Sequence, residues 1–195
     1  MHTNPPLVPD GLAELSARPA PRKLWQPGDL FHNLWRYPRK PTARRVDRVA
    51  EILRHGIVAP AMCADGAVSS DLQIRVTGTS TPYDSLVFLH RFGADSSIYT
   101  ISDRGRVTLF IDPEIAVLTP ADMGDNWVEL CQDEVYVRDR VPVEKIIGLV
   151  AHPADADSLL AELLPDFQRL GIPLYWDDGT VAWASANHSA NSLQR

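Results

Sequence analysis

The chain has 195 residues, 45% of them hydrophobic, and a formal net charge of −6 at pH 7. This size and composition predict one globular domain with a buried core, and the acidic total excludes a uniformly basic nucleic-acid coat. Two cysteines far apart, no basic and then apolar start, and no apolar run near the ~20 residues of a bilayer span predict a cytoplasmic protein without disulfides or membrane segments.

The two ends differ in composition from the middle of the chain. Residues 1–23 are rich in proline and predict a flexible segment, and residues 184–195 are small and polar and predict a disordered tail. A single folded domain is therefore expected over residues 24–183.

Hydrophobic periodicity within this domain predicts short strands and a few helices. The expected strands are 29–35, 84–90, 106–111, 126–130, 134–138, 145–151 and 172–176. The expected helices are 42–55 and 154–169, with irregular or partly helical chain at 60–82 and 94–100. This order favours a mixed α+β fold over a repeating β-α-β fold.

Glycine and proline mark where the expected elements end. Gly56 is predicted to close the first helix in a left-handed conformation. Gly171 is predicted to close the second helix. Pro165 is predicted to kink or end the second helix near Leu164. Residues 177–179 (Asp-Asp-Gly) predict a hairpin turn, with too few following oxygen ligands for calcium.

A basic run follows the first strand, with Trp35 and Tyr37 among its cations. Such a run is commonly a solvated face, but it also suits the pyrophosphate of a dinucleotide or a nucleic-acid backbone. Its members are Arg36, Arg39, Lys40, Arg44, Arg45 and Arg48.

Glu134 opens an apolar strand that runs into a turn at Val141-Pro142. A carboxylate at such a strand start can bind a sugar hydroxyl or stabilise a developing cation. The ordinary alternative is a solvated glutamate on an edge strand.

Three segments in this order resemble the ADP-ribosyltransferase superfamily. They are a strand with an aromatic residue and a histidine (Phe31-His32), a helix ending in Leu53-Arg54-His55-Gly56-Ile57, and the strand of Glu134 followed by Val141-Pro142-Val143-Glu144. Within the superfamily the chain is most similar to DarT-type DNA-modifying toxins, whose central strand resembles residues 83–99. The resemblance covers about residues 29–152.

The resemblance implies an α+β domain of split antiparallel sheets with flanking helices, binding NAD in the cleft between the sheets. It implies a glycosyltransferase that uses NAD as a substrate and no metal. The acceptor of ADP-ribose would be a macromolecule, nucleic acid or protein, and the chain would be a cytoplasmic, toxin-type effector.

The resemblance also implies residue roles. Glu134 would be catalytic, with Arg75 assisting near the acceptor and Gln132 helping to select the target. In the NAD site His32 would hold the ribose as a neutral imidazole.

The remaining NAD contacts are implied in the same way. Arg36 would meet the phosphates, Tyr99 would stack on nicotinamide, and Ser102 would bond its amide. The small hydroxyl residue that often follows the histidine in this superfamily is replaced here by Asn33-Leu34. Each of these side chains also has an ordinary explanation, as a core residue or a surface residue.

Two other classes of function stay open. One is a non-catalytic interaction module on the same or a similar fold, and the other is an RNA 2′-phosphotransferase. Metal spacing, a glycine-rich phosphate loop and a G-x-S-x-G elbow are absent from the sequence. His90 and His152 end strands and could act as bases, but neither has a nucleophile partner evident in sequence.

Overall fold

The computed structural model describes residues 26–34, 44–59, 61, 85–93, 107–124, 127 and 133–184. The expected flexible segment at 1–23 and residues 185–195 of the expected tail lie outside this part of the chain. So do most of the segments 60–82, 94–100 and 126–130.

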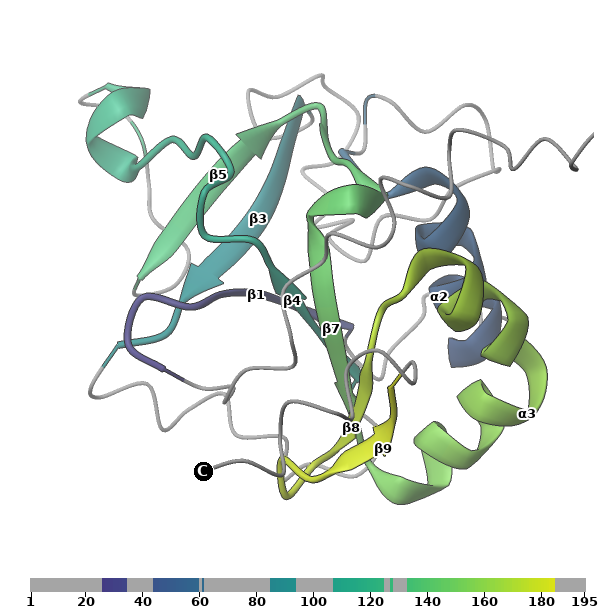
Figure 1. Cartoon of the computed structure of the whole chain (residues 1–195). Coiled ribbons are helices and arrows are strands. Elements are labelled where there is room, and N and C mark those ends of the chain that lie inside the picture. The colour runs from purple at the N-terminus through teal and green to yellow at the C-terminus, as the bar shows by residue number, and fades with distance from the viewer. Residues whose placement is uncertain are drawn as a thin grey trace, which may run out of the picture.

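Seven strands form one mixed sheet (Figure 1) in the order β5-β3-β1-β4-β7-β8-β9. Their bounds are β1 Leu30–Leu34, β3 Leu86–Arg91, β4 Val107–Ile111, β5 Glu134–Arg138, β7 Ile146–Ala151, β8 Leu174–Trp176 and β9 Val181–Trp183. All neighbours are antiparallel except β7 and β8. Two short strands, β2 (Ile57–Val58) and β6 (Arg140–Val141), form a separate antiparallel pair.

Two α-helices pack together on one side of the sheet (Figure 1). They are α2 (Arg45–His55) and α3 (Pro153–Leu170), and α3 connects the parallel strands β7 and β8. Short 3-10 helices, η4 (Pro120–Met123) and η5 (Val143–Lys145), precede β5 and β7. The prediction of a single mixed α+β domain is therefore confirmed.

Side-chain alternation along the strands divides the core between two faces. The helix-facing side buries the larger apolar cluster, which includes Leu30, Leu34, Val87, Leu89, Leu109, Val135, Leu149, Leu163 and Phe167. The outer face carries two smaller clusters, one of Phe31, Phe110, Val150 and Tyr175 and one of Leu86, Phe88 and Tyr136. Polar side chains on the outer face are therefore set among aromatic rings.

The ladder between β1 and β3 is short. Only Leu30↔Arg91 and Phe31↔His90 are in register between these two described strands, whereas β1 pairs with β4 along its whole length, from Leu30 to Leu34. Beyond Phe31 the sheet therefore divides into a β3–β5 part and a part that begins with β1.

The ends of the elements follow the expected positions with two differences. Gly171 closes α3, as predicted, and is left-handed, but Gly56 has φ 78° and ψ −174°, a region open only to glycine and distinct from the left-handed helical one. Of the two effects expected of Pro165, a kink or an end near Leu164, the end is wrong, because α3 continues to Leu170, close to the expected bound of 169. Phe167 and Leu170 are buried in the core, and this burial offsets the backbone hydrogen bond that a proline cannot make.

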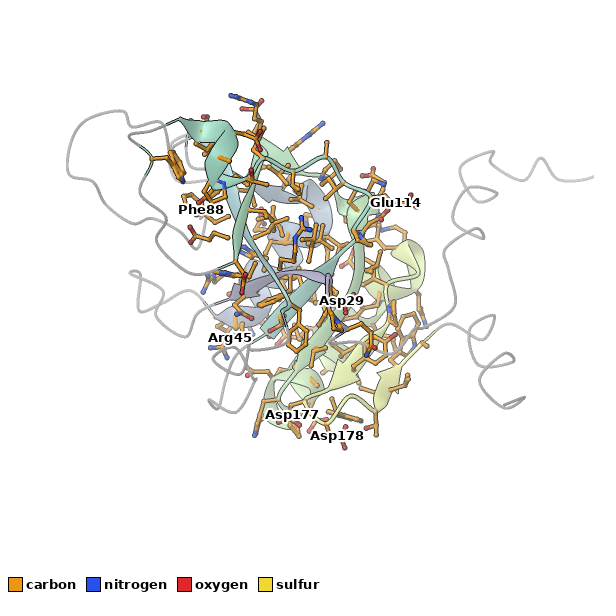
Figure 2. All side chains as sticks on the ribbon, turned by 90° about the vertical axis from the view of Figure 1, so that its left-hand side faces the viewer. Asp29, Arg45, Phe88, Glu114, Asp177 and Asp178 are labelled. Atoms are coloured by element: carbon orange, nitrogen blue, oxygen red, sulfur yellow. The ribbon has the colours of Figure 1, made fainter. Side chains whose placement is uncertain are left out.

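The hairpin expected at residues 177–179 is confirmed, since β8 and β9 pair across it. Asp177 and Asp178 of this turn lie far from Phe88, at the other end of the molecule (Figure 2). Among the described residues no helix is long and apolar enough to cross a membrane.

Candidate active site

Glu134 is the first residue of β5 and is buried, with 4% of its surface exposed. Asp133, just before it, has φ 62° and gives its carbonyl to the amide of Arg91, so the chain turns sharply into the strand. The alternative of a solvated edge glutamate is therefore wrong for Glu134. A buried carboxylate needs hydrogen-bond donors, because burial without them is costly.

Tyr136 supplies one of these donors. Its hydroxyl group donates to Oε2 of Glu134 at 3.0 Å, and Nε1 of Trp127 donates to the Tyr136 oxygen at 2.8 Å. Tyr136 is fully buried, and its ring meets those of Phe88 and Trp127 edge to face. These contacts fix the position of one carboxylate oxygen.

His90 lies directly opposite Glu134 on the neighbouring strand β3. Residues in this relation have Cβ atoms about 4.5–5.5 Å apart. Burial, and secondarily the nearby His32, lowers the pKa of His90 to about 4, so the ring is neutral at pH 7. Phe31 continues this row across the sheet, with its ring centroid 5.4 Å from that of His90.

His32 lies where β1 and β3 separate. Its Nδ1 is 2.9 Å from the carbonyl oxygen of Phe88, and since a carbonyl only accepts, Nδ1 carries the hydrogen. Burial lowers the pKa of His32 to about 4, and the Phe88 carbonyl bond only partly opposes this effect. The ring is therefore neutral at pH 7, and its Nε2 is an acceptor.

His32 and Glu134 do not share a face of the sheet. His32 is paired with Leu109 and shares the helix-facing side of β1 with Leu30 and Leu34. Glu134 lies with His90 on the outer face. The two histidines are nevertheless close enough for His32 to affect the pKa of His90. His90 is thus near both sequence-predicted residues, at the point where the sheet divides.

A buried cation also lies near His32. Arg48 of α2 is only 7% exposed, and its charge contributes to the lowered pKa of His32. Burial, followed by repulsion from Arg45, lowers the pKa of Arg48 to about 10, so it stays charged at pH 7.

The other described members of the basic run bind carboxylates. Arg45 pairs with Asp155 of α3 at 2.7 Å, and Arg44 pairs with Glu162 of α3 at 2.9 Å. These two arginines therefore tie α2 to α3, and Arg48 is the described member nearest the site.

Asn33 and Thr108 form a polar pair on the outer face. The Thr108 hydroxyl group donates to Oδ1 of Asn33 at 2.6 Å, while Nδ2 of Asn33 is buried without a hydrogen-bond partner among the described residues. An unused buried donor of this kind suits an acceptor atom of a ligand or water.

Five sequence-predicted site residues lie outside the described part of the chain: Arg75, Arg36, Tyr99, Ser102 and Gln132. The structure therefore locates Glu134 and His32 alone among the predicted set. It adds Tyr136 and Trp127, which sequence reasoning missed, and it places Arg48 of the predicted basic run near His32. Strand alternation gives a signal for Tyr136, because residues two apart on a strand share a face.

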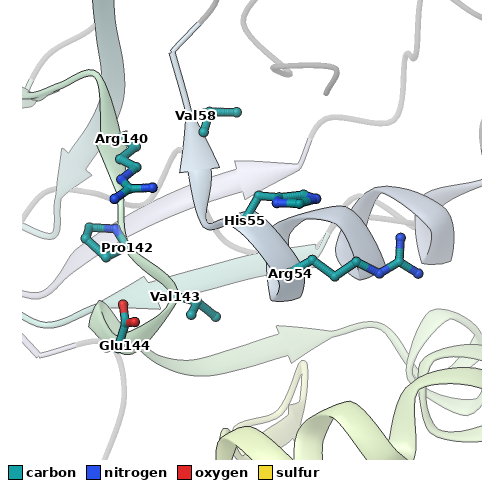
Figure 3. Close-up of a pocket in the computed structure, with 7 residues that line it drawn as sticks. All are labelled: Arg54, His55, Val58, Arg140, Pro142, Val143 and Glu144. Carbon is teal, nitrogen blue, oxygen red and sulfur yellow. The ribbon is translucent and has the colours of Figure 1, made fainter. Parts of the chain in front are cut away.

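A separate open pocket of about 340 Å³ lies between the end of α2 and the β6–η5 segment (Figure 3). It is lined by Arg54, His55, Val58, Arg140, Pro142, Val143 and Glu144. The lining carries both signs of charge, from Arg54, Arg140 and Glu144, and Arg54 is itself paired with Glu51. This pocket does not include Glu134 or either buried histidine.

Within the described ranges, no group of three or more histidine, cysteine, aspartate or glutamate side chains is placed to hold a metal ion. The sequence matches no protein-family model and no curated protein.

Proposed function

We propose that the chain is an NAD-dependent ADP-ribosyltransferase that transfers ADP-ribose to a macromolecular acceptor, nucleic acid or protein. The observation that carries the proposal is the buried Glu134 carboxylate. It is anchored through Oε2 and lies opposite a neutral histidine where the sheet divides. The division of the sheet between β1 and β3 supports the resemblance to a fold built of split sheets.

The reaction breaks the bond between C1′ of the ribose and the nicotinamide nitrogen. The bonding electrons leave with nicotinamide and neutralise its positive ring, while positive charge develops on the ribose. Glu134 stabilises that charge as it develops, in a buried site where electrostatic interactions are strong. A nucleophilic oxygen or nitrogen of the acceptor then bonds to C1′, and its proton passes to Glu134.

His32 suits the ribose because its imidazole is neutral and its Nδ1 is already bonded to Phe88. His32 and Glu134 lie on opposite faces of the sheet, so both would reach one ribose through the division between β1 and β3. Its Nε2 is left to accept a hydrogen bond from a ribose hydroxyl group. Arg48 of the basic run would meet the pyrophosphate, because it is a buried cation close enough to His32 to lower the pKa of that ring.

Transfer of label tests this function. Protein is incubated with NAD labelled in its adenylate group and, separately, with single-stranded DNA, RNA or a protein mixture. We expect label on one acceptor class, and loss of that transfer in Glu134→Gln. Glu114→Gln is the matched control, because Glu114 is exposed and outside the site. Equal transfer by Glu134→Gln contradicts the proposal.

Two further arms of this experiment separate the alternatives. A non-catalytic interaction module gives no transfer. If it also does not bind NAD, NAD does not raise its thermal stability. A protein that binds NAD is stabilised by roughly 2.7 kcal/mol when NAD is present at about 100 times its Kd. An RNA 2′-phosphotransferase removes phosphate from 2′-phosphorylated RNA in the presence of NAD.

A further inference from the structure

A chain of two hydrogen bonds ends on Glu134. Trp127 Nε1 lies 2.8 Å from the Tyr136 oxygen, and that oxygen lies 3.0 Å from Oε2 of Glu134. All three side chains belong to the outer face or cover it, and Tyr136 and Glu134 are buried.

The direction of this chain follows from the chemistry of its first member. An indole nitrogen only donates, so the Tyr136 oxygen must accept from Trp127. Tyrosine has one hydroxyl hydrogen, and with Trp127 on its oxygen that hydrogen is directed to Oε2. Oε2 is therefore the acceptor of this hydrogen bond, which favours Oε1 over Oε2 as the site of any proton that Glu134 carries.

We propose that Tyr136, oriented by Trp127, is a positioning residue that holds Oε2 as a fixed hydrogen-bond acceptor. Oε1 is then the oxygen of Glu134 that faces the ribose cation and receives the acceptor's proton. This inference rests on the proposed function. It adds which oxygen of the Glu134 carboxylate acts on the ribose and which residue holds the other oxygen.

The surroundings of Tyr136 hold its ring in place. Its backbone exchanges two hydrogen bonds with Leu118, at 2.7 and 2.8 Å, on the outer edge of β5. Its ring packs edge to face between Phe88 and Trp127, with centroids 5.2 and 5.0 Å away. The hydroxyl group therefore has little freedom to leave Oε2.

Tyr136→Phe tests the role in catalysis. The hydrogen bond from Tyr136 stabilises the charged Glu134 carboxylate. Its loss should lower kcat by about 10- to 100-fold and leave KM for NAD nearly unchanged. The acid limb of the pH profile should also move to higher pH, because loss of a donor favours the protonated carboxyl group. Trp127→Phe should have a smaller effect in the same direction, since Tyr136 can still donate.

The control is Tyr175→Phe, which removes another buried tyrosine hydroxyl group, on β8, far along the sheet from β5. In the Glu134→Gln background, Tyr136→Phe should cause no further loss of kcat. An unchanged kcat and pH profile in Tyr136→Phe, or a loss of equal size in Tyr175→Phe, overturns the inference.

A second measurement does not depend on activity. In protein labelled with ¹³C at glutamate carboxyl carbons, the Glu134 signal is identified by its absence from Glu134→Gln. It should become protonated at higher pH in Tyr136→Phe than in the wild-type protein, and an identical titration overturns the inference. If Tyr136→Phe does not fold, Trp127→Phe replaces it, with a smaller shift in the same direction expected and no shift overturning the inference.

Failure of the proposed function looks different. If the wild-type protein does not cleave NAD while its Glu134 signal responds to Tyr136→Phe, the proposed function is overturned and the assignment of Oε1 with it. Cleavage of NAD that is indifferent to Tyr136→Phe overturns the inference alone.

Discussion

His90 faces Glu134 directly across the β3–β5 ladder, although the two residues are 44 positions apart in the sequence. The pairing sets a neutral imidazole beside a carboxylate in a region that both side chains share with aromatic rings. A buried acid and a neutral base at one point are characteristic of sites that transfer protons or stabilise charge.

The two buried histidines predict a loss of stability in acid. Each has a pKa near 4 in the folded protein, below the ordinary histidine value of 6.5, so the unfolded chain binds more protons between these values. Stability is then fully present above pH 6.5 and falls as the pH drops toward 4, by about 3 kcal/mol for each histidine. Urea unfolding across this range measures the loss.

His90→Gln removes one of the two titrating groups. The slope of unfolding free energy against pH between 6.5 and 4 should therefore become smaller in this variant. A slope in His90→Gln equal to that of the wild-type protein contradicts the prediction.

Any side chain in place of Gly56 should lower the free energy of unfolding severely. A Cβ atom at this position would overlap the carbonyl oxygen of Val141, and the φ of 78° with ψ of −174° is open only to glycine. Gly56→Ala should destabilise the protein by about 3 kcal/mol or more. Gly179→Ala has a similar φ of 84° and open space, and should cost about 1–2 kcal/mol. Equal costs would show that the close approach to Val141 is absent.

Pro165 predicts a stabilising substitution. It lies inside α3, where it removes a backbone hydrogen bond and its ring crowds the preceding turn. Pro165→Ala should raise the free energy of unfolding by about 1–3 kcal/mol. Pro153→Ala is the control, because a proline in the first turn of a helix costs nothing and should give no gain. A lower free energy of unfolding in Pro165→Ala than in the wild-type protein would contradict this prediction.

The two ion pairs between α2 and α3 should differ in strength. Arg45 and Asp155 have side chains 16% and 21% exposed, whereas Arg44 and Glu162 are 60% and 42% exposed. A double-mutant cycle with Arg45→Gln and Asp155→Asn should give a coupling of about 1–2 kcal/mol. The same cycle on Arg44 and Glu162 should give a smaller coupling, because solvent screens that pair. A larger coupling for the exposed pair would contradict this order.

The local elements could be predicted because their signals are local. The strand at 134–138 was placed without error, since alternating apolar residues follow Glu134 and the turn at Pro142 follows. An end at Pro165 stays open in the sequence because the cost of a proline inside a helix is local, while the burial of Phe167 and Leu170 that offsets it comes from the tertiary structure.

The site was harder to predict for the same reason. Glu134 and His32 were found through their positions in strands, but the register that sets His90 against Glu134 comes from a long-range pairing that sequence alone does not show. Arg48 belongs to a basic run in the sequence, and the run does not reveal that Arg48 is buried, because its burial depends on how α2 packs on the sheet.

The central claim is best tested by nicotinamide release from NAD alone, followed by chromatography. The wild-type protein and Glu114→Gln should both release nicotinamide, and Glu134→Gln should fall by about 100-fold or more while it still binds NAD. Release by Glu134→Gln at the wild-type rate, or no release by a folded wild-type protein that NAD does not stabilise, would contradict the account.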